Sequence, residues 1–347
     1  MTGERRPHLP RPTYAPALLA LGLMTLLWGA VTTWVISAVG LILTGLASVR
    51  WIRDLSAEPH IALAEAEKKR GPEERAAARV KTAASDETVT YQPGLHWYAM
   101  LLSACTLALL VTGALVTSHD LTPSALLKQT HLIAGIAVGL LSLGLALWTA
   151  KGPAVSSRLG WLVVAGAVVL SVLGRPNIVV AVFHAWLAQL FFALTVVVAL
   201  VTSQSWIHPV PVEAPGRLRL PMLSLVAVVL MLLQVGMGAA VRHRAMGAVP
   251  HIVGALVVTI VLLLTAILVT NQVPEHAALH PAAKTLIGLT FTQVMLGMGA
   301  FITRLMAEES SLAVVIPSVS HVATGSLTLA ATVTVALLIR RCAREVG

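Results

Sequence analysis

Charged residues are scarce in this chain. They make up 11% of its 347 residues, whereas hydrophobic residues make up 57%. Together with a mean hydropathy of +0.84, this composition lies outside the range of soluble globular domains. The sequence therefore predicts an integral membrane protein. Because backbone polar groups in hydrocarbon must be satisfied within each spanning segment, we expect an all-α fold.

Cysteine is also nearly absent. One of the two cysteines, Cys105, lies inside an apolar run, and the other, Cys342, lies in the C-terminal tail. Neither can bridge loops outside the membrane, so the sequence indicates no structural disulfide. Iron–sulfur and zinc sites that need clustered cysteines are excluded as well.

Apolar runs of membrane-spanning length recur between short polar loops, and they predict ten helices. A two-helix transmembrane hairpin is expected at 15–31 and 34–52. An eight-helix bundle follows, with spans at 97–117, 130–148, 159–173, 180–201, 220–241, 251–270, 283–303 and 318–339.

These spans define four parts of the chain. The hairpin occupies residues 1–55, and a charged linker rich in Ala, Glu and Lys occupies residues 56–95. The linker has too few large apolar residues for a core, so we favour a solvated connector over a binding domain. The bundle divides into an N-terminal four-helix half, 96–215, and a C-terminal four-helix half, 216–347.

The distribution of basic residues predicts the orientation in the membrane. With both termini on one side, nineteen Lys and Arg residues fall on that side and five on the other. The positive-inside rule then places both termini in the cytoplasm. The net charge of +9 is explained by this topology and by attraction to anionic membrane lipid, and no nucleic-acid partner is indicated. The five outer residues are Lys128, Arg175, Arg242, Arg244 and Arg304.

Four histidines stand at the first turn of alternate predicted spans of the bundle: His131, His184, His251 and His321. An imidazole inside a membrane is costly to place and normally faces the interior of a helix bundle. A single such histidine is more often a packing residue than a ligand. Four in equivalent positions predict two pairs of metal ligands, most simply the axial ligands of two haems.

The two halves repeat each other. The segment that begins at Gly113 reads GALVTSH and the one at Gly238 reads GAAVRH, and each is followed by a span that opens with His131 or His251. Halves with an even number of spans share one orientation, so we expect pseudo-symmetric halves that each carry one histidine pair. This argues against a transporter built from inverted repeats.

Other residues are expected to complete the haem sites near the outer face. Small residues let the helices approach closely, at Gly135, Gly139, Gly144, Gly236, Gly238, Gly297 and Gly299. Apolar side chains would hold the macrocycle, namely Leu187, Phe191, Val253 and Leu256. Outer cations would face its propionates, namely Lys128, Arg242, Arg244 and Arg304.

Several stretches resemble the haem A synthase family of bacteria and mitochondria. They are His96-Trp97, the segment 112–118 (TGALVTS), the segment 184–192 (HAWLAQLFF) and the segment 234–251 (QVGMGAAVRHRAMGAVPH). The resemblance runs from His96 to Arg341 and covers the whole bundle.

The resemblance implies an enzyme of the bacterial inner membrane that oxidises the C8 methyl of haem O to a formyl group, giving haem A for cytochrome c oxidase. It implies haem b on His251 and His321, and the substrate haem O on His131 and His184. Cytochrome c oxidase or haem O synthase would be contact partners. Whether a quinone or another carrier is the redox partner stays open.

The chain departs from the family pattern beside the first histidine. The family carries a Glu three positions before it and usually an Arg directly after it, where this chain has Lys128 and Leu132. The ammonium of Lys128 has the opposite charge to the carboxylate that would stabilise a developing cation. The identity of the catalytic residue therefore stays open. The alternative function is therefore a non-catalytic haem-binding protein for electron transfer or oxidase assembly.

The N-terminal hairpin has a resemblance of its own. Residues 14–55, with Trp28-Gly29 and Thr32-Thr33-Trp34, are similar to the small subunit IV of some bacterial haem-copper oxidases. A fusion of this kind would keep haem maturation close to the oxidase. A generic membrane anchor explains the hairpin equally well.

Overall fold

The computed structural model describes residues 91–118, 125–150, 152, 154–173, 177–212, 219–308 and 311–343. Of the first 90 residues it describes Leu18, Gly22, Thr25, Val35, 38–47 and 49–50. The chain divides into two units, Met1–Glu87 and Thr88–Gly347. In the first unit, an apolar helix covers Ala38–Ala47, and most of the predicted hairpin and linker lies outside the described residues.

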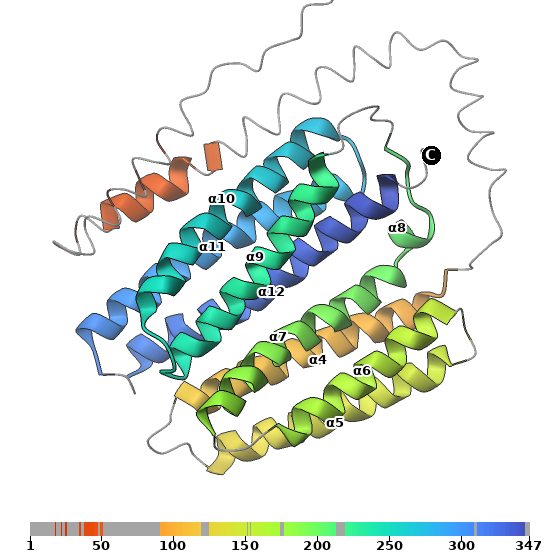
Figure 1. The fold of residues 1–347 in the computed structure, drawn as a ribbon, viewed down its shortest axis with the longest axis horizontal. Coiled ribbons are helices and arrows are strands. Elements are labelled where there is room, and N and C mark those ends of the chain that lie inside the picture. The colour runs from red at the N-terminus through yellow and green to blue at the C-terminus, as the bar shows by residue number, and fades with distance from the viewer. Residues whose placement is uncertain are drawn as a thin grey trace, which may run out of the picture. The chain divides into compact units, whose positions relative to one another are not determined.

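In the described part of the second unit, eight long helices follow one another along the chain, with one short helix between the fourth and the fifth. They are α4 (Pro93–Ser118), α5 (Ala125–Thr149), α6 (Ala154–Val172), α7 (Ile178–Val201), α8 (Gln204–Ile207), α9 (Arg219–Arg242), α10 (Ala248–Gln272), α11 (Leu279–Met306) and α12 (Leu312–Ala343). Figure 1 shows them as two groups, α4 to α7 and α9 to α12.

Each of the eight predicted spans of the bundle coincides with one long helix. Within the described residues, seven of these helices are long and apolar enough to cross a membrane, and α6 is the shorter exception. A helix satisfies its own backbone groups, which is what hydrocarbon requires. The protein is an all-α integral membrane protein, as the sequence predicts.

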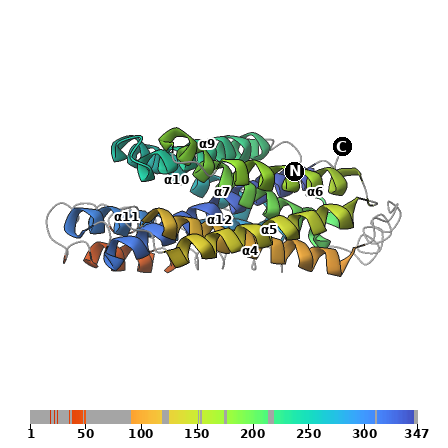
Figure 2. The same cartoon turned by 90° about the horizontal axis from the view of Figure 1, so that it is seen from below.

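Within each group the helices close a ring. In the first group α4 contacts α5, α5 contacts α6, α6 contacts α7, and α7 returns to α4. In the second group α9, α10, α11 and α12 repeat this order, and α12 returns to α9. The long helices run alongside one another in both groups, as the second view shows (Figure 2).

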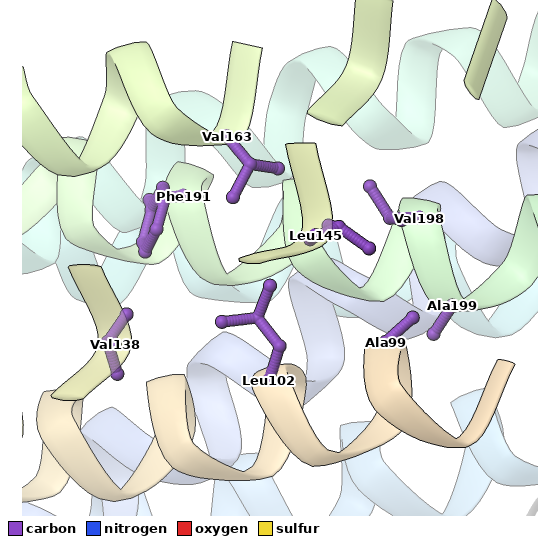
Figure 3. Close-up of a cluster of buried hydrophobic side chains, with 8 residues drawn as sticks. All are labelled: Ala99, Leu102, Val138, Leu145, Val163, Phe191, Val198 and Ala199. Atoms are coloured by element: carbon purple, nitrogen blue, oxygen red, sulfur yellow. The ribbon is translucent and has the colours of Figure 1, made fainter. Parts of the chain in front are cut away.

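The first group packs around a small apolar core that draws on all four of its helices. Leu102 on α4, Leu145 on α5 and Val163 on α6 are fully buried, and Phe191 on α7 closes the cluster (Figure 3). The outer faces of the same helices carry exposed apolar side chains such as Leu140. Lipid is as apolar as leucine, so these faces contact lipid and the core is held by close packing.

The two groups meet along α4 and α7 on one side and α9 and α12 on the other. Leu110, Phe192 and Ala330 form an apolar cluster across this boundary. Polar contacts cross it as well: the indole Nε1 of Trp186 donates to the Leu232 carbonyl at 3.0 Å, and the Ser326 hydroxyl lies 3.2 Å from Gln189 Oε1. In hydrocarbon these donors have no water as an alternative partner.

Leu145→Ala is expected to lower the free energy of unfolding by about 2 kcal/mol or more, because it opens a cavity in the core that the surrounding side chains cannot fully fill. Leu140→Ala on the same helix is the control, since that side chain is 66% exposed. Unfolding in detergent mixtures with increasing SDS measures both. Equal losses in the two variants would contradict this assignment of the core.

Candidate functional site

The four histidines lie at one end of the bundle, each near the N-terminus of its helix. His131 is on α5, His184 on α7, His251 on α10 and His321 on α12. Only His251 lies in the first helical turn, so the prediction of first-turn positions is wrong for the other three. Their helices begin earlier, at Ala125, Ile178 and Leu312, because a helix continues past the apolar run by which a span is predicted.

A glycine on a neighbouring helix lies directly under three of these imidazoles. A Cβ atom would lie 2.9 Å from His131 Cε1 at Gly113, 3.1 Å from His251 Cε1 at Gly238 and 2.8 Å from His321 Cε1 at Gly297. Any larger residue would push the ring away.

The predicted close approaches are thereby confirmed at Gly238 and Gly297, and Gly113 makes a third approach of the same kind. The prediction is wrong for Gly139, where a Cβ atom would meet nothing within 4 Å.

Each imidazole faces a backbone carbonyl of a neighbouring helix. The carbonyls are those of Leu109, Leu170, Gln234 and Gln293, which face His131, His184, His251 and His321 in that order. In the sequence, each of these four residues precedes a glycine by four positions. At Gly113, Gly238 and Gly297 this glycine lies against the ring, so the same local frame is used three times among the described residues.

The contacts of His321 fix which ring nitrogen carries the proton. Its Nδ1 lies 3.1 Å from the Gln293 carbonyl oxygen, which can only accept a hydrogen bond. Nδ1 therefore donates, and the lone pair of Nε2 faces the Gln293 amide Nε2, 3.3 Å away. A neutral imidazole held in this way is the usual form of a histidine that binds a metal.

His131 is held in the same tautomer by a different residue. The Thr112 hydroxyl donates to the Leu109 carbonyl at 2.8 Å, so its oxygen can only accept from His131 Nδ1, which is 3.0 Å away. Nε2 of His131 is again left with its lone pair. His184 is less constrained, because the buried Nδ1 faces the Leu170 carbonyl without hydrogen-bond geometry and has no partner in the described chain.

His251 and His321 face each other across the second group of helices. Their ring centroids are 6.2 Å apart and their planes cross at 87°. A bond between a metal and an imidazole nitrogen is about 2 Å long, so two imidazoles on opposite sides of one metal have centroids roughly 6 Å apart. The pair therefore has the spacing of two axial ligands.

His131 and His184 are close enough to interact electrostatically, as are His251 and His321. Among the described residues, no group of three or more His, Cys, Asp or Glu side chains is arranged to hold a metal ion. Two protein ligands suit a metal whose other ligands come from a cofactor, and iron in a porphyrin is such a metal. In number and spacing the paired imidazoles fit haem, whereas the Gln293 amide Nε2 lies 3.3 Å from His321 Nε2.

Two of the expected cations lie near the second pair. Arg242 and Arg304 are both close enough to His321 for their positive charges to act on it electrostatically. Arg242 also joins the two groups of helices: its guanidinium donates to Thr117 Oγ1 and to Ser118 Oγ at 2.9 and 2.8 Å, and to the Ala114 carbonyl. Lys128 lies on α5, one turn before His131, and is exposed.

The expected apolar contacts to a macrocycle are partly wrong. Val253 and Leu256 are 59% and 65% exposed, and Phe191 is buried in the core of the first group. Helix α10 is apolar on all sides, so hydrophobicity does not mark the side that faces the bundle interior.

The fold and the paired imidazoles define an all-α membrane protein with two candidate sites for a metal-containing cofactor. Neither a protein-family model nor a curated protein matches this chain.

Arg242→Met is expected to lower the free energy of unfolding by about 1–3 kcal/mol, because the acceptors at the end of α4 lose the hydrogen bonds that the guanidinium donates to them. Arg304→Met is the control, since it removes the other cation that reaches His321. Thermal unfolding in detergent measures both variants. A larger loss for Arg304→Met would show that Arg242 does not join the two groups.

Proposed function

We propose that this protein is a membrane-embedded haem oxidoreductase of the haem A synthase type. It would lie in a bacterial inner membrane with both termini in the cytoplasm and the histidine end of the bundle at the outer face. The observation that carries the proposal is the geometry of His251 and His321, whose centroid spacing of 6.2 Å matches axial ligation of one iron.

The two pairs would have different roles. His251 and His321 would hold a resident haem b, because their ring centroids are 6.2 Å apart and a glycine of a neighbouring helix lies against each ring. His131 and His184 would hold the substrate haem O, and the unpartnered His184 Nδ1 fits a site whose occupant exchanges. A bound haem would supply a one-electron iron couple.

In the proposed reaction, the protein's own residues would orient the ligand imidazole and exclude water from the site. Thr112 and the Leu109 carbonyl hold His131 with Nε2 free for iron, and Gly113 lets the ring lie against α4. The exposed apolar faces of the surrounding helices keep the site within lipid. We further propose contact with cytochrome c oxidase or haem O synthase, with an oxidase subunit IV-like role for residues 1–55.

A second function is favoured by Lys128. The ammonium stands one turn before His131, where the resembling family has a carboxylate. A cation there opposes a developing positive charge on the substrate. The alternative is a non-catalytic b-type haem protein that exchanges electrons with a quinone or with the oxidase.

Extraction of pigment separates these functions. The full chain is expressed in membranes that contain haem O, and the extracted haems are resolved chromatographically. Haem A is expected if the protein is a synthase, and its formation should depend on His131. Recovery of haem B and haem O alone, with a reducible b-type spectrum, would establish the non-catalytic alternative.

His251→Ala and His321→Ala are each expected to abolish the b-type absorption of the resident haem, because one axial ligand is lost. His131→Ala should retain this absorption and stop haem A formation. His96→Ala is the matched control. His96 lies at the end of α4 away from the four histidines, where it contacts the Ala199 carbonyl. Reduced-minus-oxidised spectra of purified protein measure all four, and full absorption in His251→Ala would refute the assignment.

A further inference from the structure

The side chain of Gln293 contacts the ring nitrogen of His321 that iron would need. The backbone carbonyl of Gln293 lies 3.1 Å from Nδ1, which therefore carries the proton, and the amide Nε2 lies 3.3 Å from the ring Nε2. The ring Nε2 has no proton of its own in this tautomer, so the amide donates and the ring lone pair accepts. A lone pair that accepts a hydrogen bond is not available to a metal.

We propose that the Gln293 amide is a displaceable cap on His321, which competes with iron for Nε2 and thereby limits haem affinity at the second pair. This inference rests on the proposed function, because it concerns how the same pair would take up its haem. The side chain of Gln293 therefore opposes ligation, while its backbone carbonyl prepares the ring for it.

Helix α12 provides the space in which the cap lies. Gly325 follows His321 by four positions, about one helical turn, so both residues lie on the same face of α12. A Cβ atom on Gly325 would lie 2.9 Å from Gln293 Nε2 and 3.8 Å from its Oε1. Because this position has no side chain, the amide can lie beside the imidazole.

The cap is held weakly enough to be displaced. Its 3.3 Å distance to the ring exceeds the usual range of about 2.7–3.2 Å for an N–H donor. The Gln293 Oε1 atom is buried and has no hydrogen-bond partner in the described part of the chain. A buried acceptor without a partner is destabilising, so the amide loses little when it rotates away from His321.

The other ring of the pair is also engaged by a glutamine. Gln234 Nε2 lies 3.0 Å from His251 Nδ1 and donates to the His251 carbonyl at 2.8 Å. Because Nδ1 accepts from this amide, the proton of this ring is on Nε2. In this arrangement neither ring of the pair presents a free Nε2 lone pair, so both glutamines act against ligation of iron.

At the matching positions the first half has leucines. The backbone carbonyls of Leu109 and Leu170 face the first two imidazoles as those of Gln234 and Gln293 face the second two. A leucine side chain carries no donor and cannot cap a ring nitrogen. The packing of the helices therefore does not require the glutamines, and the cap distinguishes the second pair from the first.

Titration of the haem-free full chain with haem b in detergent measures the competition. His131→Ala serves as the parent, so that the second pair alone binds the added haem. In this parent, Gln293→Leu removes the amide and keeps the backbone carbonyl that holds His321 Nδ1. Its affinity for haem b is expected to rise roughly fivefold, the value of one neutral hydrogen bond, and its association should become faster. Absorbance at equilibrium and after rapid mixing gives both quantities.

Two further variants of the parent identify the cause of such a rise. Gln293→Asn keeps an amide but is one carbon shorter, so it no longer reaches the ring and should bind haem b about as tightly as Gln293→Leu does. Thr292→Val is the matched control on α11, because Thr292 is exposed and its hydroxyl donates to the Gly288 carbonyl of the same helix. It should bind haem b as the parent does.

The inference and the proposed function fail in different ways. If the parent binds haem b and Gln293→Leu binds it equally or more weakly, the inference alone is overturned. A rise in Gln293→Leu without one in Gln293→Asn assigns the effect to apolar contact and also overturns the inference alone. Binding by both Gln293 variants but not by the parent supports the cap and overturns the resident haem. If no variant binds haem b, both proposals are overturned.

Discussion

The placement of the paired histidines depends on the close approach of an imidazole to a glycine on the neighbouring helix. Within hydrocarbon a ring nitrogen must find its partner inside the protein, and the nearest acceptor is a backbone carbonyl already used by its own helix. A glycine one turn above that carbonyl removes the obstructing side chain, as at Gly297 for His321. With Nδ1 held in this way, the rings of His131 and His321 each keep a lone pair on Nε2.

Duplication reuses this frame and changes the residues around it. In the second half Gln234 and Gln293 surround the pair with amides, whereas the first half has Leu109 at the matching place and a single hydroxyl from Thr112. The helices pack in the same cyclic order in both halves. Differences in chemistry between two sites therefore arise from a few side chains on an unchanged backbone plan.

Much of the bundle could be predicted from the sequence, because the length of an apolar run is a direct consequence of membrane thickness. The four histidines were found by their rarity in such runs. The predicted span begins at residue 318, whereas α12 begins at Leu312 and runs through Pro317. The direction in which Val253 faces could not be predicted, because lipid and protein interior favour the same residues. The predicted hairpin falls mostly outside the described residues.

The polar contacts between the halves make each half dependent on the other. Trp186, Gln189 and Arg242 direct their polar groups across the boundary to Leu232, Ser326 and the end of α4. A solitary half would present such groups to lipid, where they have no partner. Each half therefore depends on the other to satisfy these polar groups, and neither half could be separated within a membrane without leaving donors and acceptors unpaired.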